Sequence, residues 1–206
     1  MKKQLFLTFS VVLILFLCLE SKLNAQVYCG SPYQGTTRTY ILSPTCTTTV
    51  DICYYCNATA PIITLGIMGT SDFCPGWDPN DYWALVREKV MNDWAILCGS
   101  TPCNQGTPAT VNIMFPTCMQ YFWNGTTLSC TSCTSVYCYY SYTVCWDYYP
   151  PPGHSRWTLV DPCHTEETSP CLGVAVPVIG IDTPPLTPNV AWSTPSTCFN
   201  VHCDCK

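Results

Sequence analysis

The sequence predicts a predominantly β protein with one amphipathic helix. This is an α+β fold in which a disulfide-rich antiparallel sheet or sandwich carries a helix at about residues 79–98. Three observations predict this class. Apolar residues alternate with a period of two in most segments, the period changes to three and four residues between 79 and 98, and 18 cysteines occur in 206 residues. Together they indicate a thin sheet whose small core is reinforced by covalent crosslinks.

Residues 1–25 have the pattern of a cleaved secretory signal peptide. Lys2 and Lys3 precede an apolar run over residues 5–19, and Ala25 is a small residue suited to cleavage. The run is shorter than the ~20 residues that a membrane-spanning helix needs. We therefore expect a mature chain that begins at Gln26 and has no integral membrane segment after cleavage. It should be secreted or held at the cell surface, in an extracellular or periplasmic location.

The mature chain is acidic and sparsely charged. Charged residues make up 10% of the sequence, against roughly 25% in an ordinary soluble domain. After residue 25 there are five Lys and Arg against twelve Asp and Glu, a net charge of −7. Such a chain lacks the basic surface that binds phosphate backbones, so we expect no nucleic-acid partner.

Strands are expected on both sides of the helix. Runs of β-forming residues bounded by Pro, Gly and Asn predict strands at residues 36–42, 50–56, 62–68, 110–115, 119–123, 136–148, 156–160 and 172–181. Asn124-Gly125 predicts a hairpin turn. In the long strand the alternation places Cys138 and Cys145 on opposite faces, so each should crosslink the strand to a different neighbour.

The helix has a clear start and one apolar stripe. Asp78 is a good N-cap, and Pro79 suits the first helical position. The stripe recurs at three- and four-residue steps and consists of Trp83, Val86, Val90, Trp94 and Leu97. Arg87, Glu88 and Asn92 fall mainly on the other side of the helix, and Gly99 ends it. Cys98 is placed where a disulfide could pin the helix end to the sheet.

One domain with extended ends is the expected organisation. The sequence shows no repeat of fixed period, and the strands and the helix form one continuous pattern. We expect a disulfide-rich β-dominated domain over residues 26–183. A proline-rich extended tail over residues 184–206 follows it and ends in a cysteine cluster.

Seventeen cysteines remain after cleavage, and their density predicts a disulfide framework in an oxidising compartment. The expected disulfide-forming residues are Cys29, Cys46, Cys53, Cys56, Cys74, Cys98, Cys103, Cys118, Cys130, Cys133, Cys138, Cys145, Cys163, Cys171, Cys198, Cys203 and Cys205. Because the number is odd, at least one is unpaired or forms an intermolecular disulfide. Cys53-Tyr54-Tyr55-Cys56 and Cys130-Thr131-Ser132-Cys133 have the spacing of zinc and redox sites. We favour structural disulfides to other partners, because neither segment opens a helix after a strand.

No motif for catalysis or cofactor binding is present, so we predict no catalytic residue and no cofactor, and we do not favour an enzyme. His202, Cys203 and Cys205 are the candidate ligands for a soft metal, with a disulfide-tied C-terminus as the favoured alternative. A secreted hydrolase would have to use Glu88, His164 or Glu166 as its acid or base.

Aromatic residues provide the remaining functional signal. The candidate binding patch consists of Tyr121, Trp123, Tyr139, Tyr148 and Tyr149. Exposed Tyr and Trp rings stack on sugars or contact protein surfaces, whereas buried ones would only fill a thin core. The sequence therefore predicts a secreted, disulfide-stabilised structural or binding protein that recognises extracellular glycan or protein through these rings. A secreted hydrolase with a His/carboxylate site, or a secreted inhibitor or toxin, is the alternative.

Overall fold

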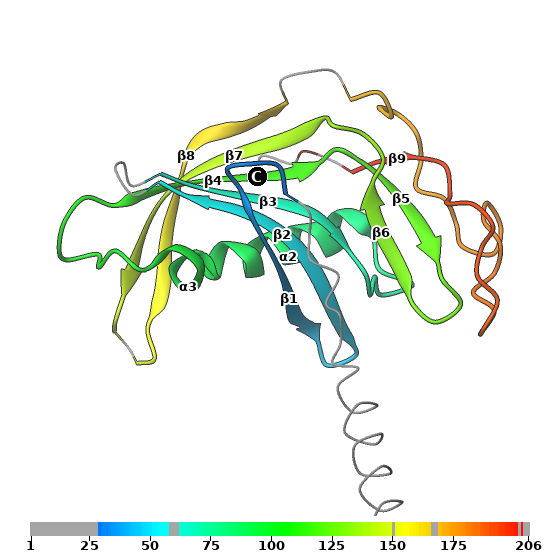
Figure 1. The fold of residues 1–206 in the computed structure, drawn as a ribbon, viewed down its shortest axis with the longest axis horizontal. Helices are drawn as coiled ribbons and strands as arrows, with labels where there is room; N and C mark the ends of the chain where they lie inside the picture. The colour runs from blue at the N-terminus through cyan, green and yellow to red at the C-terminus, as the bar shows by residue number, and fades with distance from the viewer. Residues whose placement is uncertain (1–28, 58–61, 150, 166–168, 202, 204–206) are drawn as a thin grey trace, which may run out of the picture.

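The structure is a computed structural model that describes residues 29–57, 62–149, 151–165, 169–201 and 203, with the backbone alone for 161–165. The predicted leader, His202, Cys205 and Glu166 lie outside the described residues. In the described part of the chain, strands predominate and helices occupy one segment (Figure 1). The elements are β1 (Gln34–Ser43), β2 (Cys46–Cys56), β3 (Ile62–Thr70), α2 (Pro79–Asn92), α3 (Trp94–Cys98), β4 (Ala109–Pro116), β5 (Cys118–Trp123), β6 (Leu128–Ser132), β7 (Tyr137–Asp147), β8 (His154–Thr165) and β9 (Phe199–Asn200). The predicted α+β, disulfide-rich class is confirmed.

All nine described strands belong to one sheet. Its main path runs β8-β7-β4-β3-β6-β5-β9, and β2 joins β3 to β1 as a branch. Every pair is antiparallel except β3 and β4, which are parallel from Ile62↔Thr110 onward. The sheet is therefore mixed, and it is not a sandwich. A parallel pair needs a long crossover connection, and here the segment that holds α2 and α3 provides it.

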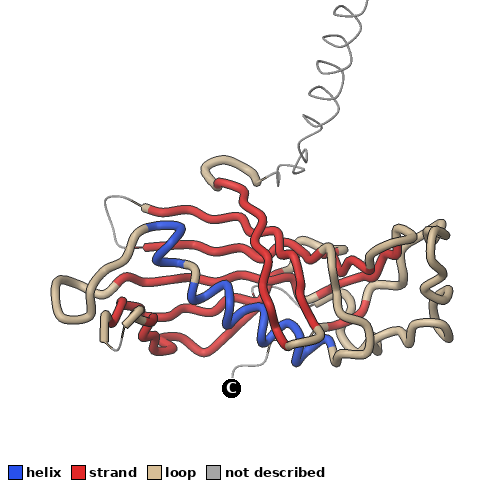
Figure 2. The backbone as a smooth tube through the Cα atoms, turned by 90° about the horizontal axis from the view of Figure 1, so that it is seen from below, coloured by secondary structure: helices blue, strands red, loops and turns tan. Residues whose placement is uncertain are grey.

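The sheet arches over the two helices, which lie across its strands (Figures 1 and 2). The predicted helical stripe faces the sheet: Trp83, Val86, Val90 and Trp94 are buried, and Leu97 packs at the edge of the core. The strands complete this core with buried side chains that include Ile52, Leu65, Ile67, Val111 and Ile113. Full burial of each large apolar side chain contributes roughly 1.5–3 kcal/mol.

The helix begins where predicted but is interrupted near its end. The Asp78 carboxylate accepts hydrogen bonds from the backbone N–H groups of Asn80 and Asp81, at 2.8 and 3.3 Å. Asp93 separates α2 from α3, and its carboxylate accepts a hydrogen bond from the Tyr40 hydroxyl of β1 at 2.6 Å. Arg87 also departs from its predicted place, because its guanidinium lies 4.3 Å from the centre of the Tyr140 ring on β7.

Local patterns predicted some strands better than others. The alternation in β7 is as expected, with Cys138, Tyr140, Tyr142 and Val144 buried and the residues between them half-buried. Asn124-Gly125 does connect a hairpin, but its second strand, β6, is short and polar and was not predicted. The expected strand at residues 172–181 is wrong. Glycines with positive φ at 173 and 180, together with local turn hydrogen bonds, replace ladder pairing there.

Seven disulfides crosslink the described residues. They are Cys29–Cys53, Cys46–Cys74, Cys56–Cys98, Cys103–Cys145, Cys118–Cys171, Cys133–Cys198 and Cys138–Cys203. Neither Cys-x-x-Cys segment closes on itself, and Cys138 and Cys145 bond different neighbours. The Cys56–Cys98 bridge joins the end of α3 to β2.

Among the cysteines whose side chains the structure describes, Cys130 alone forms no disulfide, and the odd number predicted at least one unpaired or intermolecular cysteine. Cys130 is free and fully buried, and burial raises the pKa of its thiol. The reason lies in its position on β6, where its side chain points into the core rather than toward another cysteine. The side chain of Cys163 and all of Cys205 lie outside what the structure describes.

The C-terminal segment packs against the sheet. The Trp192 amide donates to the carbonyl oxygen of Trp123 at 2.9 Å, and the Ser196 amide donates to that of Tyr121 at 2.9 Å. Phe199, in β9, is fully buried beside Tyr121. Among the described helices, none has the length and apolar composition needed to cross a bilayer.

Candidate functional site

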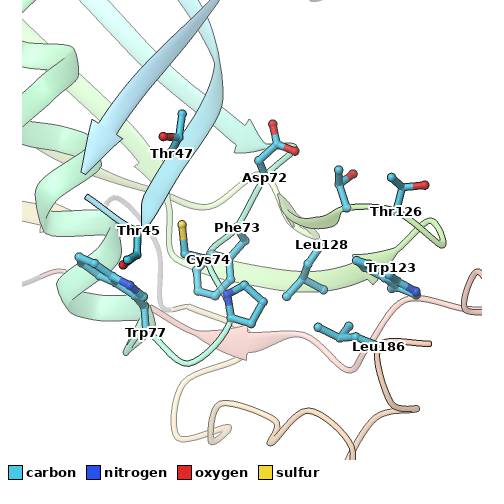
Figure 3. A pocket seen from close by; sticks show the side chains of 12 residues that line it. Thr45, Thr47, Asp72, Phe73, Cys74, Trp77, Trp123, Thr126, Leu128 and Leu186 are labelled. Atoms are coloured by element: carbon cyan, nitrogen blue, oxygen red, sulfur yellow. The ribbon is translucent and has the colours of Figure 1, made fainter. Parts of the chain in front are cut away.

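A groove of about 550 Å³ lies between Trp77 and Trp123, and we call it the Trp77–Trp123 groove. Figure 3 shows the two indoles at opposite ends, with Phe73 and Leu128 between them and Asp72 at one side. The lining residues are Thr45, Thr47, Asp72, Phe73, Cys74, Pro75, Trp77, Trp123, Thr126, Thr127, Leu128 and Leu186. The groove thus combines an apolar floor, an aromatic ring at each end and a rim of oxygen atoms.

Four segments that are distant in the sequence build the walls. Thr45 and Thr47 come from the β1–β2 turn and the start of β2, and Asp72 to Trp77 come from the connection between β3 and α2. The β5–β6 hairpin supplies the opposite wall, and Leu186 comes from the C-terminal segment. The Cys46–Cys74 disulfide ties the first two segments together, so the groove does not depend on weak loop contacts alone.

The floor is part of the protein core. Phe73 is buried, its amide donates to the carbonyl oxygen of Leu128 at 2.6 Å, and its ring packs on Tyr82 and Tyr121, with centroids 4.3 and 5.1 Å away. Burial raises the pKa of Tyr82 to about 12, although its hydroxyl shares a hydrogen bond with Thr48. Because the Tyr82 and Tyr121 rings support Phe73 from the core side, the floor of the groove has its shape before a ligand binds.

Each end of the groove has an indole, but the two are held differently. The Trp123 indole N–H donates to the carbonyl oxygen of Thr187 at 2.9 Å, and Trp123 is only 9% exposed. Trp77 is half-buried, with its backbone amide 3.4 Å from the carbonyl oxygen of Cys74. Trp77 therefore offers the more accessible ring for stacking.

The rim carries hydroxyl groups and one carboxylate. Thr45, Thr47 and Thr126 are exposed, and Asp72 is half-buried, with the Ser71 hydroxyl donating to its Oδ2 at 3.4 Å. The hairpin that carries Thr126 is rigid, because the Asn124 side-chain oxygen accepts from the amides of Thr126 and Thr127 at 2.8 Å each. Polar groups thus have defined positions above the apolar floor.

The predicted aromatic patch does not form one surface. Tyr121 is 2% exposed and packs in the core at a tilt against Phe73 and Phe199, and burial raises the pKa of its hydroxyl. Trp123 reaches the groove, whereas Tyr139 is half-buried on the opposite face of β7 from the core. The alternation along each strand separates these rings, since only the residues that face the helices enter the core.

Tyr148 and Tyr149 lie elsewhere, where β7 turns toward β8. Tyr149 is 81% exposed, and both tyrosines line a cavity of about 300 Å³ with Trp146, Arg156 and other residues. Arg156 pairs there with Asp147 at 3.5 Å. This second aromatic site is distinct from the groove and shares no lining residue with it.

Trp77 and Leu186 line the groove, and neither was among the binding residues predicted from the sequence. Trp77 and Asp72 stand five residues apart in the segment Asp72-Phe73-Cys74-Pro75-Gly76-Trp77. The available signal was a cysteine-, proline- and glycine-containing loop that carries two aromatic residues. A disulfide at its cysteine can fix the position of such a loop although it forms neither a strand nor a helix.

The predicted metal and hydrolase residues do not form a site in the described part of the chain. Cys203 is bonded to Cys138, and His202 and Cys205 lie outside the described residues. Glu88 is exposed on α2, the His164 side chain is not among those described, and Glu166 lies outside. In the described ranges, no group of three or more His, Cys, Asp or Glu residues is arranged to hold a metal ion.

Comparison of the chain with protein-family models, with curated proteins and with solved structures gives no match. The disulfide framework nevertheless indicates the environment. Seven disulfides are typical of a protein that folds in an oxidising compartment, so the chain is a disulfide-stabilised protein of secreted or extracellular type.

Proposed function

We propose that this protein binds glycans outside the cell and that the Trp77–Trp123 groove is its binding site. The observation that carries the proposal is the pairing of two indoles with an oxygen-rich rim over an apolar floor. A pyranose ring has the complementary chemistry, because its C–H faces are apolar and its edges carry hydroxyl groups. Ligand sites in proteins commonly combine apolar surface with a few fixed polar groups in this way.

The rigidity of the groove supports the proposal. The Cys46–Cys74 disulfide, the buried Phe73 ring and the hydrogen bonds of the Asn124 turn hold its walls before any ligand arrives. A preformed site avoids the entropy loss of ordering loops on binding, and this raises the affinity for a small flexible ligand. Binding of this kind needs no catalytic group.

A glycan array followed by calorimetry tests the proposal. Wild-type protein is expected to bind at least one glycan on the array, and Trp77→Ala should lower the affinity at least about tenfold by removing the accessible stacking surface. Trp157→Ala is the matched control, since Trp157 is a 46% exposed tryptophan on β8 outside the groove. Tyr149→Ala tests the second aromatic site, and both controls should bind as the wild type does.

Two results would reject the groove as the site. One is an array with no signal above background. The other is a loss of binding in Tyr149→Ala with none in Trp77→Ala, which would assign recognition to the end of the β7–β8 hairpin.

A second candidate function, binding a protein partner by strand addition, is favoured by β8. In the described sheet β8 pairs with β7 alone, and Trp157, Leu159 and Val160 on it are exposed. An exposed edge strand with apolar residues is a template for pairing with another chain. Light scattering after size exclusion is expected to show self-association of the wild-type chain through β8, and Val160→Lys should abolish this self-association. A wild-type chain that stays monomeric and captures no extended peptide would remove this candidate.

A further inference from the structure

The charges around the Trp77–Trp123 groove are unbalanced. Among its lining residues Asp72 alone carries an ionisable side chain, because Cys74 is bonded to Cys46. The two ion pairs among the described residues are Arg38–Asp93 and Arg156–Asp147, and neither includes Asp72. A ligand in the groove therefore meets one negative charge that no cation among the described residues offsets.

The described cations are all engaged or placed elsewhere. Arg38 and Arg156 belong to those ion pairs, and the Arg87 guanidinium lies 4.3 and 5.8 Å from the Tyr140 and Phe115 ring centres. Lys89 is in the last turn of α2. None of the four lines the groove. A carboxylate or sulfate on a ligand would find no counter-charge among the described residues, and none of their cations would compensate its burial against Phe73 and Leu128.

The Asp72 carboxylate should raise the affinity for uncharged glycans and lower the affinity for acidic ones. Its carboxylate accepts hydrogen bonds from sugar hydroxyl groups, and bonds to a charged acceptor are the stronger kind. The same charge repels an acidic sugar, and a cleft lined by one sign of charge concentrates that field. One side chain thus favours uncharged ligands and disfavours anionic ones.

We infer that the groove selects uncharged glycans and excludes acidic ones through Asp72. This inference rests on the proposed glycan-binding function and adds the ligand class to it. The wild-type protein should bind uncharged array members in preference to uronic-acid-containing and sulfated ones by at least about fivefold at low salt. The preference should shrink as salt rises, while binding of the uncharged glycan stays constant.

The decisive variant is Asp72→Asn, which keeps the size of the side chain and removes its charge. Calorimetry with the strongest uncharged array ligand and with tetragalacturonate should give changes of opposite sign. The uncharged ligand should weaken several-fold, and the acidic one should bind more tightly. A folding defect would weaken both together, so opposite signs report the charge itself.

Thr126→Lys is an independent variant that adds a cation at the exposed rim. Relative to Thr126→Gln, a control of similar length that also lacks the hydroxyl group, it should raise the ratio of the affinity for tetragalacturonate to that for the uncharged ligand. Equal binding of acidic and uncharged glycans by the wild type would overturn the inference and leave glycan binding intact. Unchanged selectivity in both charge variants would also overturn it. Absence of binding to every glycan would instead overturn the proposed function.

Discussion

Removal of the Cys56–Cys98 disulfide is expected to lower the free energy of unfolding by about 4 kcal/mol. The bridge spans a sequence separation of 42 residues. In the chain-entropy description, closing a loop of that length in the unfolded state accounts for about 4 kcal/mol at 25 °C. Serine at both positions removes the bridge without creating an unpaired thiol.

The Cys103–Cys145 disulfide is a matched control, because its sequence separation is also 42 residues. It joins the loop that follows α3 to β7, whereas Cys56–Cys98 joins the end of α3 to β2. If restriction of the unfolded chain is the main term, the two double-serine variants should lose the same free energy to within about 1 kcal/mol. If native contacts are the main term, the two losses should differ.

Guanidinium unfolding followed by far-ultraviolet circular dichroism, without reductant, measures both losses. Hydrogen exchange adds a local readout, since amides of α3 should lose protection in the Cys56/Cys98 variant and keep it in the Cys103/Cys145 variant. A loss near zero for one pair beside a full loss for the other would refute the entropic reasoning. It would show instead that each bridge acts through the contacts that it holds in the folded state.

The remaining predictions concern the core. Trp94→Phe should destabilise the protein by about 1–3 kcal/mol, because the indole N–H donates to the buried Ser155 hydroxyl at 2.9 Å. A double-mutant cycle with Ser155→Ala should give a coupling near 1 kcal/mol, and strict additivity would contradict the bond. Arg87→Met should lower the stability measured by thermal unfolding by about 1 kcal/mol, because the contact between the guanidinium and the Tyr140 ring is lost. An unchanged stability would contradict a stabilising role for this contact. Burial raises the folded-state pKa of Tyr82 to about 12 from an ordinary 10. The neutral hydroxyl therefore contributes fully to the free energy of unfolding below pH 10, and this contribution is lost as pH rises through 12. Denaturant titrations should show this alkaline loss of up to about 2–3 kcal/mol. Tyr82→Phe should reduce the loss, and an unchanged pH profile in that variant would contradict burial as its cause. Iodoacetamide should alkylate Cys130 only in denaturant, as located by peptide mass mapping, and modification of the folded protein would contradict its burial.

Features that depend on a few neighbouring residues were predicted well. The start of α2 follows from Asp78 and Pro79, because the capping bonds form within one turn of the chain. The faces of β7 follow from simple alternation, because successive side chains of any strand point to opposite sides. Neither feature requires knowledge of which strands are neighbours.

Features that depend on long-range neighbours were predicted poorly. The parallel pairing of β3 with β4 and the break at Asp93 both involve partners far along the chain, since Tyr40 lies 53 residues before Asp93. Sequence alone also could not show that the rings of the candidate binding patch lie apart. Tyr121 and Tyr149 are equally aromatic in sequence, but one faces the helices and the other follows the end of a strand.

The sequence by itself determined that the protein is β-rich, has one helical segment and carries a dense set of cysteines suited to an oxidising compartment. Those properties follow from local periodicity and composition. Only the tertiary structure decided which cysteines bond, that Cys130 stays free, and that Asp72, Trp77 and Trp123 meet in one groove. The physical reason is that a disulfide or a binding site requires atoms a few ångströms apart, and sheet pairing sets such distances between residues remote in the chain.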